Sequence, residues 1–168
     1  PKVLPVHPMR AGRMVRAGKG EALPVKLAPM PAEVGDAPFR HADWAWEPKV
    51  DGYRVLVFID RDGVRLRSRR GLDLTASFPA LVKALYEQGV DGMVLDGEIV
   101  ALDAAGTPSF NALQNRVQLK TERERAAADR HTPAVFFAFD LLHFAGIGLR
   151  DAPYRERRRY LTQCLVPS

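Results

Sequence analysis

The segment "EPKVDGYR", residues 47–54, places Lys49 between carboxylates and close to Arg54. A lysine amine acts as a nucleophile only when it is deprotonated, so an enzyme that uses one must lower its pKa by desolvation or by neighbouring cations. Arg54 is near in sequence, and Arg69 can join it from a predicted hairpin. A surface lysine needs no such surroundings. The segment is therefore a candidate nucleophilic site.

Two acids interrupt apolar segments that are typical of buried strands. Glu98 lies within "MVLDGEIVAL" and Asp140 within "FFAFDLL". An unpaired carboxylate in such a place is costly, so each acid needs a compensating partner. One explanation is a buried ion pair with an arginine; the other is a metal ion or a nucleophilic lysine. The residues alone leave both explanations open.

A lysine that attacks an α-phosphorus would need further groups around it. Cations must hold the remaining phosphates, and a carboxylate must bind magnesium. The chain can supply every part from Lys49, Asp51, Arg54, Arg69 and Glu98. For Asp51, a structural ion pair and a catalytic duty are both open.

The hydrophobic patterns predict the elements that must position these residues. Residues 54–60 and 64–70 read as a hairpin around the turn "RDG", with Arg65, Arg67 and Arg69 in a row on the polar face of its second strand. Residues 77–89 show helical spacing, with Ser77 as the N-cap and Gly89 as the stop.

The second half of the chain continues the alternation of strands and helices. We predict a strand over 92–103 that is interrupted at 96–98, a helix over 109–117 behind a Ser109 cap, and a further strand over 134–144. Residues 121–131 read as an exposed helix end or loop, and a basic helix follows Pro153. The hairpin requires antiparallel pairing, so the fold class is α+β, with antiparallel sheets flanked by helices.

Composition limits the class of protein. The chain has 168 residues, 46% of them hydrophobic, which is enough to bury a core in one domain or most of one. The net charge of +5 suits a polyanionic partner. Cys164 is the single cysteine, which excludes an internal disulfide and a metal-thiolate site and favours a reducing compartment.

No apolar run approaches the roughly 20 residues of a membrane span, so we expect a cytoplasmic protein without membrane contact. The proline-rich residues 1–26 read as a linker or N-terminal extension, and 27–168 as the folded part.

Four motifs together resemble a known superfamily. Lys49-x-Asp51-Gly52-x-Arg54 looks like motif I of the covalent nucleotidyltransferases, which include ATP-dependent DNA ligases, RNA ligases and mRNA capping guanylyltransferases. The segments "RSRRG", "LDGEIV" and "FFAFDLL" resemble motifs Ia, III and IIIa, in the family's order. The sequence that flanks these motifs is most similar to the adenylation domain of bacterial multidomain end-joining DNA ligases, over about residues 27–165.

This resemblance implies a role for each motif residue. Lys49 would be the catalytic nucleophile that takes AMP from ATP as a phosphoramidate and releases pyrophosphate. Glu47 would read the adenine amino group, and Phe139 would stack on adenine.

The remaining motif residues would contact the rest of the nucleotide. Arg54 and Arg69 would hold phosphate and ribose, and Glu98 would bind the ribose or the metal. The cofactors implied are ATP and Mg²⁺ or Mn²⁺. The family's motifs IV and V, which hold the triphosphate and metal, do not occur before Ser168, and Arg70 stands where motif Ia usually has asparagine. We therefore expect residues 1–168 to bind ATP weakly and not to seal nicks unaided.

The implied substrate is nicked or broken double-stranded DNA, sealed in DNA repair and end joining. Other repair domains, or a bacterial Ku-type end-binding protein, are the implied partners. Two alternatives stay open. One is a GTP-using capping enzyme or an RNA ligase, and the other is a non-catalytic DNA-binding module that keeps the nucleotide pocket.

Overall fold

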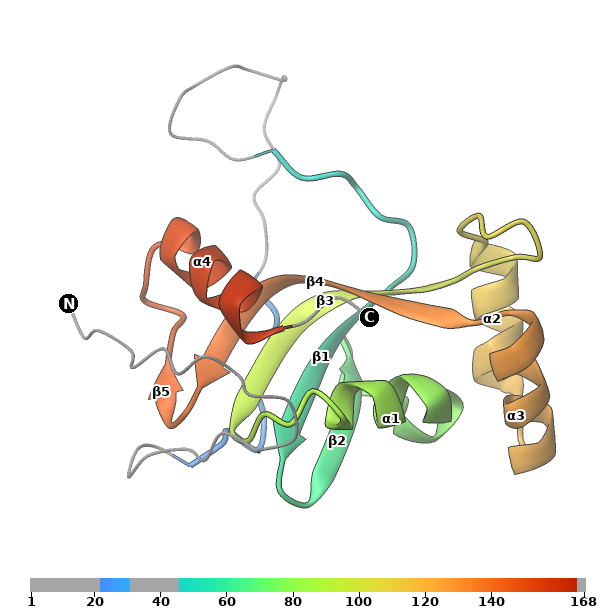
Figure 1. Cartoon of the computed structure of the whole chain (residues 1–168), viewed down its shortest axis with the longest axis horizontal. Coiled ribbons are helices and arrows are strands. Elements are labelled where there is room, and N and C mark those ends of the chain that lie inside the picture. Colours follow the sequence, from blue (N-terminus) through green and yellow to red (C-terminus); the bar gives the residue numbers. More distant parts are fainter. Residues whose placement is uncertain (1–21, 31–45, 166–168) are drawn as a thin grey trace.

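A single antiparallel sheet organises the part of the chain that the structure describes. The computed structural model describes residues 22–30 and 46–165, and its five strands follow the order β2-β1-β3-β4-β5 (Figure 1). The strands are β1 (Tyr53–Asp60), β2 (Gly63–Ser68), β3 (Met93–Ala101), β4 (Ala134–Phe144) and β5 (Ile147–Gly148). Helices flank this sheet, so the predicted α+β fold class is confirmed.

The β1–β2 hairpin forms where the sequence predicted it. The Asp60 carboxylate accepts hydrogen bonds from the backbone N–H groups of Asp62 and Gly63 and so closes the turn. The predicted row of guanidinium groups is largely neutralised, since Arg65 pairs with Asp60 at 3.0 Å and Arg67 with Asp73 at 3.2 Å. Among the described residues, no carboxylate pairs with Arg69.

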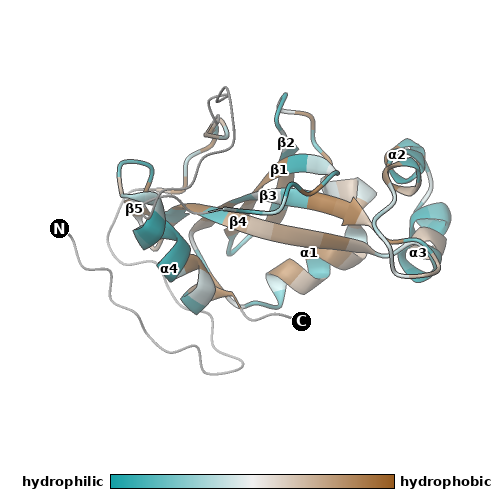
Figure 2. Cartoon of the chain, turned by 90° about the horizontal axis from the view of Figure 1, so that it is seen from above, coloured by the Kyte–Doolittle hydropathy of each residue, from teal (hydrophilic) through white to brown (hydrophobic). Residues whose placement is uncertain are grey.

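Helices α1 (Pro79–Tyr86) and α4 (Tyr154–Cys164) lie on the same side of the sheet (Figures 1 and 2). Their buried side chains form one hydrophobic cluster with the sheet; its members include Val55, Val57, Leu95, Leu141, Leu81, Leu85, Tyr160 and Leu161. Alternate residues of a strand point to opposite faces, so Val55, Val57 and Ile59 of β1 lie on this side, while Leu56 and Phe58 lie on the other.

The prediction that Ser77 caps α1 is wrong. Ser77 ends a short 3₁₀ turn, Thr75–Ser77, and the helix begins two residues later at Pro79, with Phe78 at the N-cap. Proline is favoured there because it has no N–H to leave unpaired. The helix ends at Tyr86 with Glu87 at the C-cap, before the predicted stop at Gly89; the φ of Gly89, +67°, is a conformation that favours glycine in the turn that follows.

The opposite face of the sheet is covered by residues 22–30. Leu23, Leu27 and Met30 pack against a small cluster made by Leu56, Phe58, Val94 and Leu142. Leu23 lies within the segment 1–26 that the sequence suggested as a linker, so the described end of that segment contacts the sheet.

Strand β3 runs through the "DGE" segment without a break, which corrects the predicted interruption. Its pairing with β4 shifts register between Asp96 and Gly97 instead. A Cβ on Gly97 would lie 2.4 Å from the Phe136 ring, so only glycine fits at this crossing.

Two helices close one end of the sheet. Helix α2 (Phe110–Gln118) begins at Ser109, whose hydroxyl accepts a hydrogen bond from Ala112 N–H, so the predicted cap is confirmed. Residues 121–131 are more ordered than predicted, because Thr121 and Glu124 form a capping box that starts α3 (Glu122–His131).

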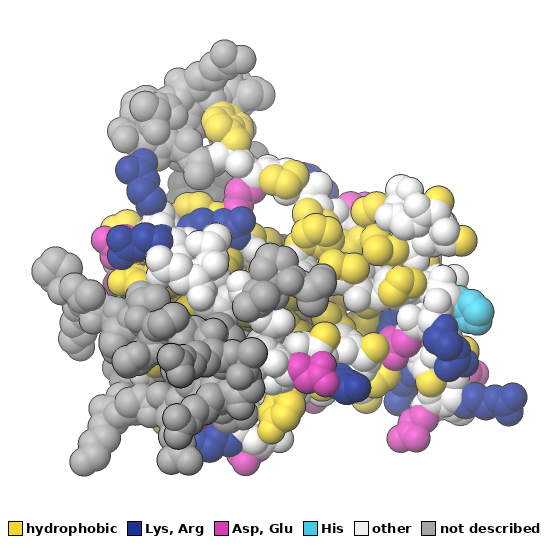
Figure 3. Space-filling model, viewed as in Figure 1, with side chains coloured by type: hydrophobic (Ala, Val, Ile, Leu, Met, Phe, Trp, Pro, Cys, Tyr) yellow, Lys and Arg dark blue, Asp and Glu magenta, His cyan; other side chains and the backbone are white. Residues whose placement is uncertain are grey.

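A groove lies between α1, β4 and α4 on the core side of the sheet. Its volume is about 580 Å³, and its lining includes Leu81, Leu85, Phe136 and Leu161. Figure 3 shows hydrophobic side chains gathered over β4 on this face. None of the predicted site residues lines the groove, so the groove and the predicted site are separate features.

Candidate active site

Lys49 lies on a coil, residues 46–52, that leads into β1. Its side chain is 86% exposed, and Nζ lies 3.6 Å from the Asp51 Oδ1 atom. An exposed ion pair of this kind stabilises the fold little, so it leaves the amine free to approach a ligand. For Asp51 the structure shows the ion pair that was one of two open explanations.

The coil is joined to β3 through Gly52. Its N–H donates to Glu98 Oε1 at 3.1 Å, and a Cβ on this residue would lie 2.1 Å from the Ile99 carbonyl oxygen. Gly52 is therefore needed for close approach to the neighbouring strand. Burial raises the pKa of Glu98, while the Gly52 N–H and the charges of Arg54 and Lys49 oppose the rise. Glu98 thus lies within the electrostatic reach of Lys49.

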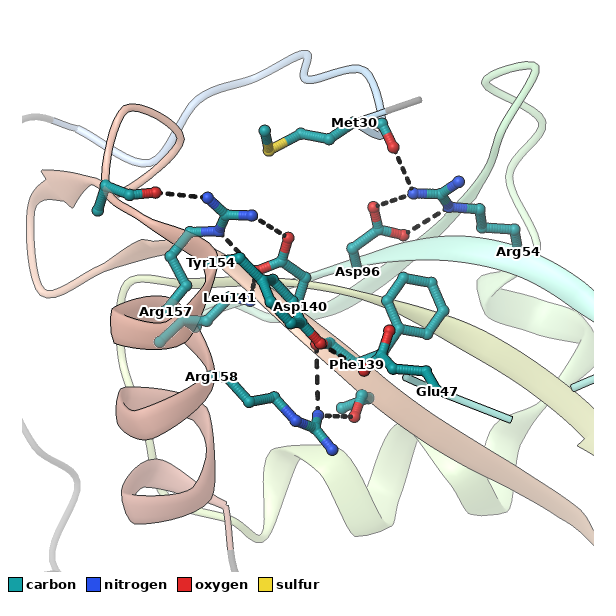
Figure 4. A network of polar contacts seen from close by, with 12 residues as sticks. Met30, Glu47, Arg54, Asp96, Phe139, Asp140, Leu141, Tyr154, Arg157 and Arg158 are labelled. Carbon is teal, nitrogen blue, oxygen red and sulfur yellow. Dashed lines mark hydrogen bonds and ion pairs between the residues drawn. The ribbon is translucent and has the colours of Figure 1, made fainter. Parts of the chain in front are cut away.

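Arg54 is held by Asp96, a residue to which the sequence analysis assigned no partner. The guanidinium donates from Nε at 3.0 Å and from Nη2 at 2.8 Å to the two carboxylate oxygens, and Nη2 also donates to the Met30 carbonyl (Figure 4). Asp96 is fully buried and raises the pKa of Arg54. The sequence contained a signal for Asp96 at the site, because Asp96 and Glu98 are two residues apart on a strand and so share a face.

Phe139 lies close to Arg54. The guanidinium carbon is 5.3 Å from the ring centroid, within the range of a cation–π contact. Arg54 also lies opposite Glu98 in the β1–β3 register, and the Arg69 N–H donates to the Arg54 carbonyl at 3.2 Å. These contacts place Arg54, Glu98 and Phe139 on the adjacent strands β1, β3 and β4, and Arg69 directly after β2, beside Arg54.

For Asp140, the structure supports the first explanation, a buried ion pair with an arginine. The guanidinium of Arg157, on α4, donates to its two oxygens at 2.7 and 2.8 Å. Both side chains are under a tenth exposed, at 8% and 7%. Glu98 differs, because no arginine lies within ion-pair distance of it among the described residues. The two acids that the sequence flagged together therefore have different surroundings.

Glu47 is bonded to α4. The Tyr154 hydroxyl donates to Glu47 Oε1, and it also lies 3.5 Å from the Phe139 carbonyl oxygen. Sequence reasoning missed Tyr154, which lay in a segment noted only as a basic helix.

Carboxylates do not gather into a metal site in the described part of the chain. No group of three or more histidine, cysteine, aspartate or glutamate side chains there is arranged to hold an ion. Asp96 and Asp140 are each paired with an arginine, whereas Glu98 accepts a hydrogen bond from the Gly52 N–H. None of the described helices is long and apolar enough to cross a membrane.

An antiparallel sheet that presents a lysine, a carboxylate, an arginine and an aromatic ring on adjoining segments is the arrangement expected of a covalent nucleotidyltransferase. The chain belongs to the ATP-dependent DNA ligase domain family, whose model matches residues 28–168.

Relatives with curated names agree. The multifunctional non-homologous end joining protein LigD of Mycobacterium bovis is 46% identical over 137 residues, which cover 80% of this chain and 16% of that protein. LigD of Pseudomonas aeruginosa is 37% identical over 93% of this chain and 17% of its own length. DNA ligase C1 of Mycolicibacterium smegmatis is 41% identical over 73% of this chain and 36% of its own length. The chain thus spans about a sixth of the LigD proteins that it matches.

Solved structures agree as well. A mycobacterial DNA ligase D complexed with ATP and MES superposes with a TM-score of 0.65 at 44% identity, over 81% of this chain and 42% of that chain. The ligase domain of M. tuberculosis LigD superposes with a TM-score of 0.55 at 44% identity, over 69% of this chain and 35% of that chain.

Proposed function

We propose that this chain is part of an ATP-dependent DNA ligase in which Lys49 takes AMP from ATP and passes it to a DNA 5′-phosphate. The observation that carries the proposal is the position of Lys49, which is exposed on a coil joined to β3 at Glu98. Arg54 and Phe139 lie on the adjoining strands.

The proposed reaction has three steps. The deprotonated Lys49 Nζ attacks the α-phosphorus, a P–N bond forms, and the bond to the β-phosphate breaks, so that pyrophosphate leaves. A DNA 5′-phosphate oxygen then attacks the same phosphorus and releases the lysine. Finally the 3′-hydroxyl attacks the adenylated 5′-phosphate, which seals the strand and releases AMP.

The other side chains bind and orient the nucleotide. Glu47 accepts from the adenine amino group, Phe139 stacks on the base, and Arg54 and Arg69 hold phosphate and ribose. Arg69 suits this role because its guanidinium has no acidic partner among the described residues, whereas two nitrogens of Arg54 are occupied by Asp96. Glu98 contacts the ribose or the metal. Mg²⁺ is usually bound by one or two carboxylates together with substrate phosphates, so a single carboxylate at this position fits Mg²⁺ or Mn²⁺.

The biological setting follows from the relatives. Two of them are named for non-homologous end joining, which supports broken double-stranded DNA as the substrate. Other repair domains and a bacterial Ku-type end-binding protein are the partners that we propose. A DNA substrate and a single cysteine support a cytoplasmic location.

Intact mass measurement tests the proposal. After long incubation with excess ATP and Mg²⁺, the chain should gain the mass of one AMP, whereas Lys49→Ala and Lys49→Arg should gain none. Arginine fails because it cannot be deprotonated in a protein. An adduct on Lys49→Ala would identify a different nucleophile, and no adduct on a wild-type chain that is saturated with ATP would favour a non-catalytic module. A GMP adduct formed from GTP in preference to ATP would favour a capping enzyme.

The hairpin offers a matched pair of variants for the same assay. Arg69→Ala should slow adduct formation about a hundredfold, which is typical for the loss of one preorganised phosphate contact. Arg67→Ala, two residues away, should have little effect because its guanidinium pairs with Asp73. Equal rates for the two variants would remove Arg69 from the site.

A further inference from the structure

Side chains from distant elements hold both ends of the coil that contains Lys49. At one end the Gly52 N–H donates to Glu98 Oε1 at 3.1 Å. At the other end the Tyr154 hydroxyl, from the first turn of α4, donates to Glu47, which precedes it by 107 residues. Lys49 lies between these two anchors. The contact of Tyr154 therefore links α4 to the site.

Tyr154 is itself held in place. The Arg157 guanidinium lies 5.6 Å from the ring centroid, and Arg157 is fixed in turn by Asp140 and by the Ala152 carbonyl (Figure 4). Burial, and then the hydrogen bond to Glu47, raise the pKa of Tyr154. The hydroxyl is thus protonated at neutral pH and donates to the Glu47 carboxylate.

A carboxylate held in this way can accept a hydrogen bond from a second donor. An ionised carboxylate has two oxygens and about four lone-pair positions, so one bond from a tyrosine leaves other positions free. The adenine amino group is a donor, whereas guanine and hypoxanthine have a carbonyl oxygen at the same place. Two acceptors cannot bond to each other, and a site built around a substrate donor rejects an analogue that lacks it.

We infer that Tyr154 is a positioning residue that orients the Glu47 carboxylate toward the adenine amino group and so sets the preference for adenine. The inference rests on the proposed function, because the role of Glu47 belongs to it. Tyr154 acts through Glu47 and does not touch the reacting atoms.

Nucleotide selectivity tests this role. The dissociation constants for ATP and for inosine triphosphate, which has the carbonyl, are measured for the wild-type chain, Tyr154→Phe and Glu47→Ala. Tyr154→Phe should lower the preference for ATP about tenfold, the effect of losing one hydrogen bond to a charged group. Its affinity for inosine triphosphate should be unchanged. Tyr160→Phe is the matched control, since it removes a hydroxyl from the same helix that contacts only Arg159 among the described residues.

The outcomes separate the inference from the proposed function. If both Glu47→Ala and Tyr154→Phe lose the preference while Tyr160→Phe keeps it, the inference holds. If Glu47→Ala loses it and Tyr154→Phe keeps it, Tyr154 has no positioning role although the proposed function stands. A wild-type chain without any preference for ATP overturns both. Partial unfolding of Tyr154→Phe would lower the affinity for both nucleotides equally, so the ratio of the two dissociation constants still reports the preference for ATP.

Discussion

Glu98 shows how a side chain at the site can oppose stability. Burial raises its pKa above the ordinary value, so the ionised form is less favourable in the folded chain than in the unfolded one. For a raised carboxyl pKa, the folded state binds more protons than the unfolded state. The contribution of Glu98 to stability is therefore complete below the unfolded pKa and is lost as pH rises through the folded pKa.

This sign predicts the behaviour of Glu98→Gln. At neutral pH the variant should melt at a higher temperature than the wild-type chain, because the amide oxygen can still accept from Gly52 N–H without a half-buried charge. The difference should vanish below about pH 4, where the wild-type carboxyl is protonated in both states. The measurement is thermal unfolding across pH. Glu87→Gln, at an exposed carboxylate on the end of α1, is the control and should show no such gain; an equal gain there would refute the prediction.

At the scale of elements, α4 is attached to the sheet by polar contacts as well as by its hydrophobic residues. Arg157 pairs with Asp140, and Arg158 donates to the Ala138 and Phe139 carbonyls at 3.0 and 3.3 Å. In the described chain β5 pairs with β4 only at His143 and Phe144. The Arg158 contacts therefore satisfy carbonyl groups of β4 beyond its pairing with β5.

The Arg157–Asp140 pair should be essential for this attachment. Arg157→Met leaves a buried carboxylate unpaired, and the loss should be about 3–5 kcal/mol in the free energy of unfolding. The double variant Arg157→Met with Asp140→Leu should recover much of it, because no buried charge remains. Denaturant titration measures both values. Arg155→Met, on the exposed side of the same helix, is the control and should change the free energy of unfolding by less than about 0.5 kcal/mol. If Arg157→Met lost no more stability than Arg155→Met, the Arg157–Asp140 pair would contribute little.

At the scale of the whole molecule, the charge balance suits a polyanionic partner, such as the DNA of the proposed function. The chain has 25 lysines and arginines against 20 acids, a net charge of +5. A surplus of this kind attracts a polyanion by releasing its counterions.

Binding to a nicked duplex should accordingly weaken with salt. If about two phosphates are neutralised, affinity should fall about tenfold between roughly 50 and 200 mM NaCl, with log Kd linear in log salt concentration. Fluorescence anisotropy of a labelled duplex measures this dependence. Affinity that does not change with salt would contradict an electrostatic contact with the phosphate backbone.

Local patterns in the sequence determined most of the elements and the identity of the motif residues. The hairpin, the Ser109 cap and the strands around Glu98 and Asp140 depend on neighbours within a few residues, so their alternation and capping signals could be read directly. Errors arose where two local signals competed, as at Ser77, where the proline in the first turn set the start of α1.

Only the tertiary structure decided which partner each charged group has. Arg54 and Asp96 are 42 residues apart, and Tyr154 and Glu47 are 107 apart. Periodicity assigns a residue to a face of its own strand or helix but does not say which distant side chain meets it there. The sequence therefore predicted that Glu98 and Asp140 each need a compensating partner, while packing decided that Asp140 pairs with Arg157 and that Glu98 accepts from the coil beside Lys49.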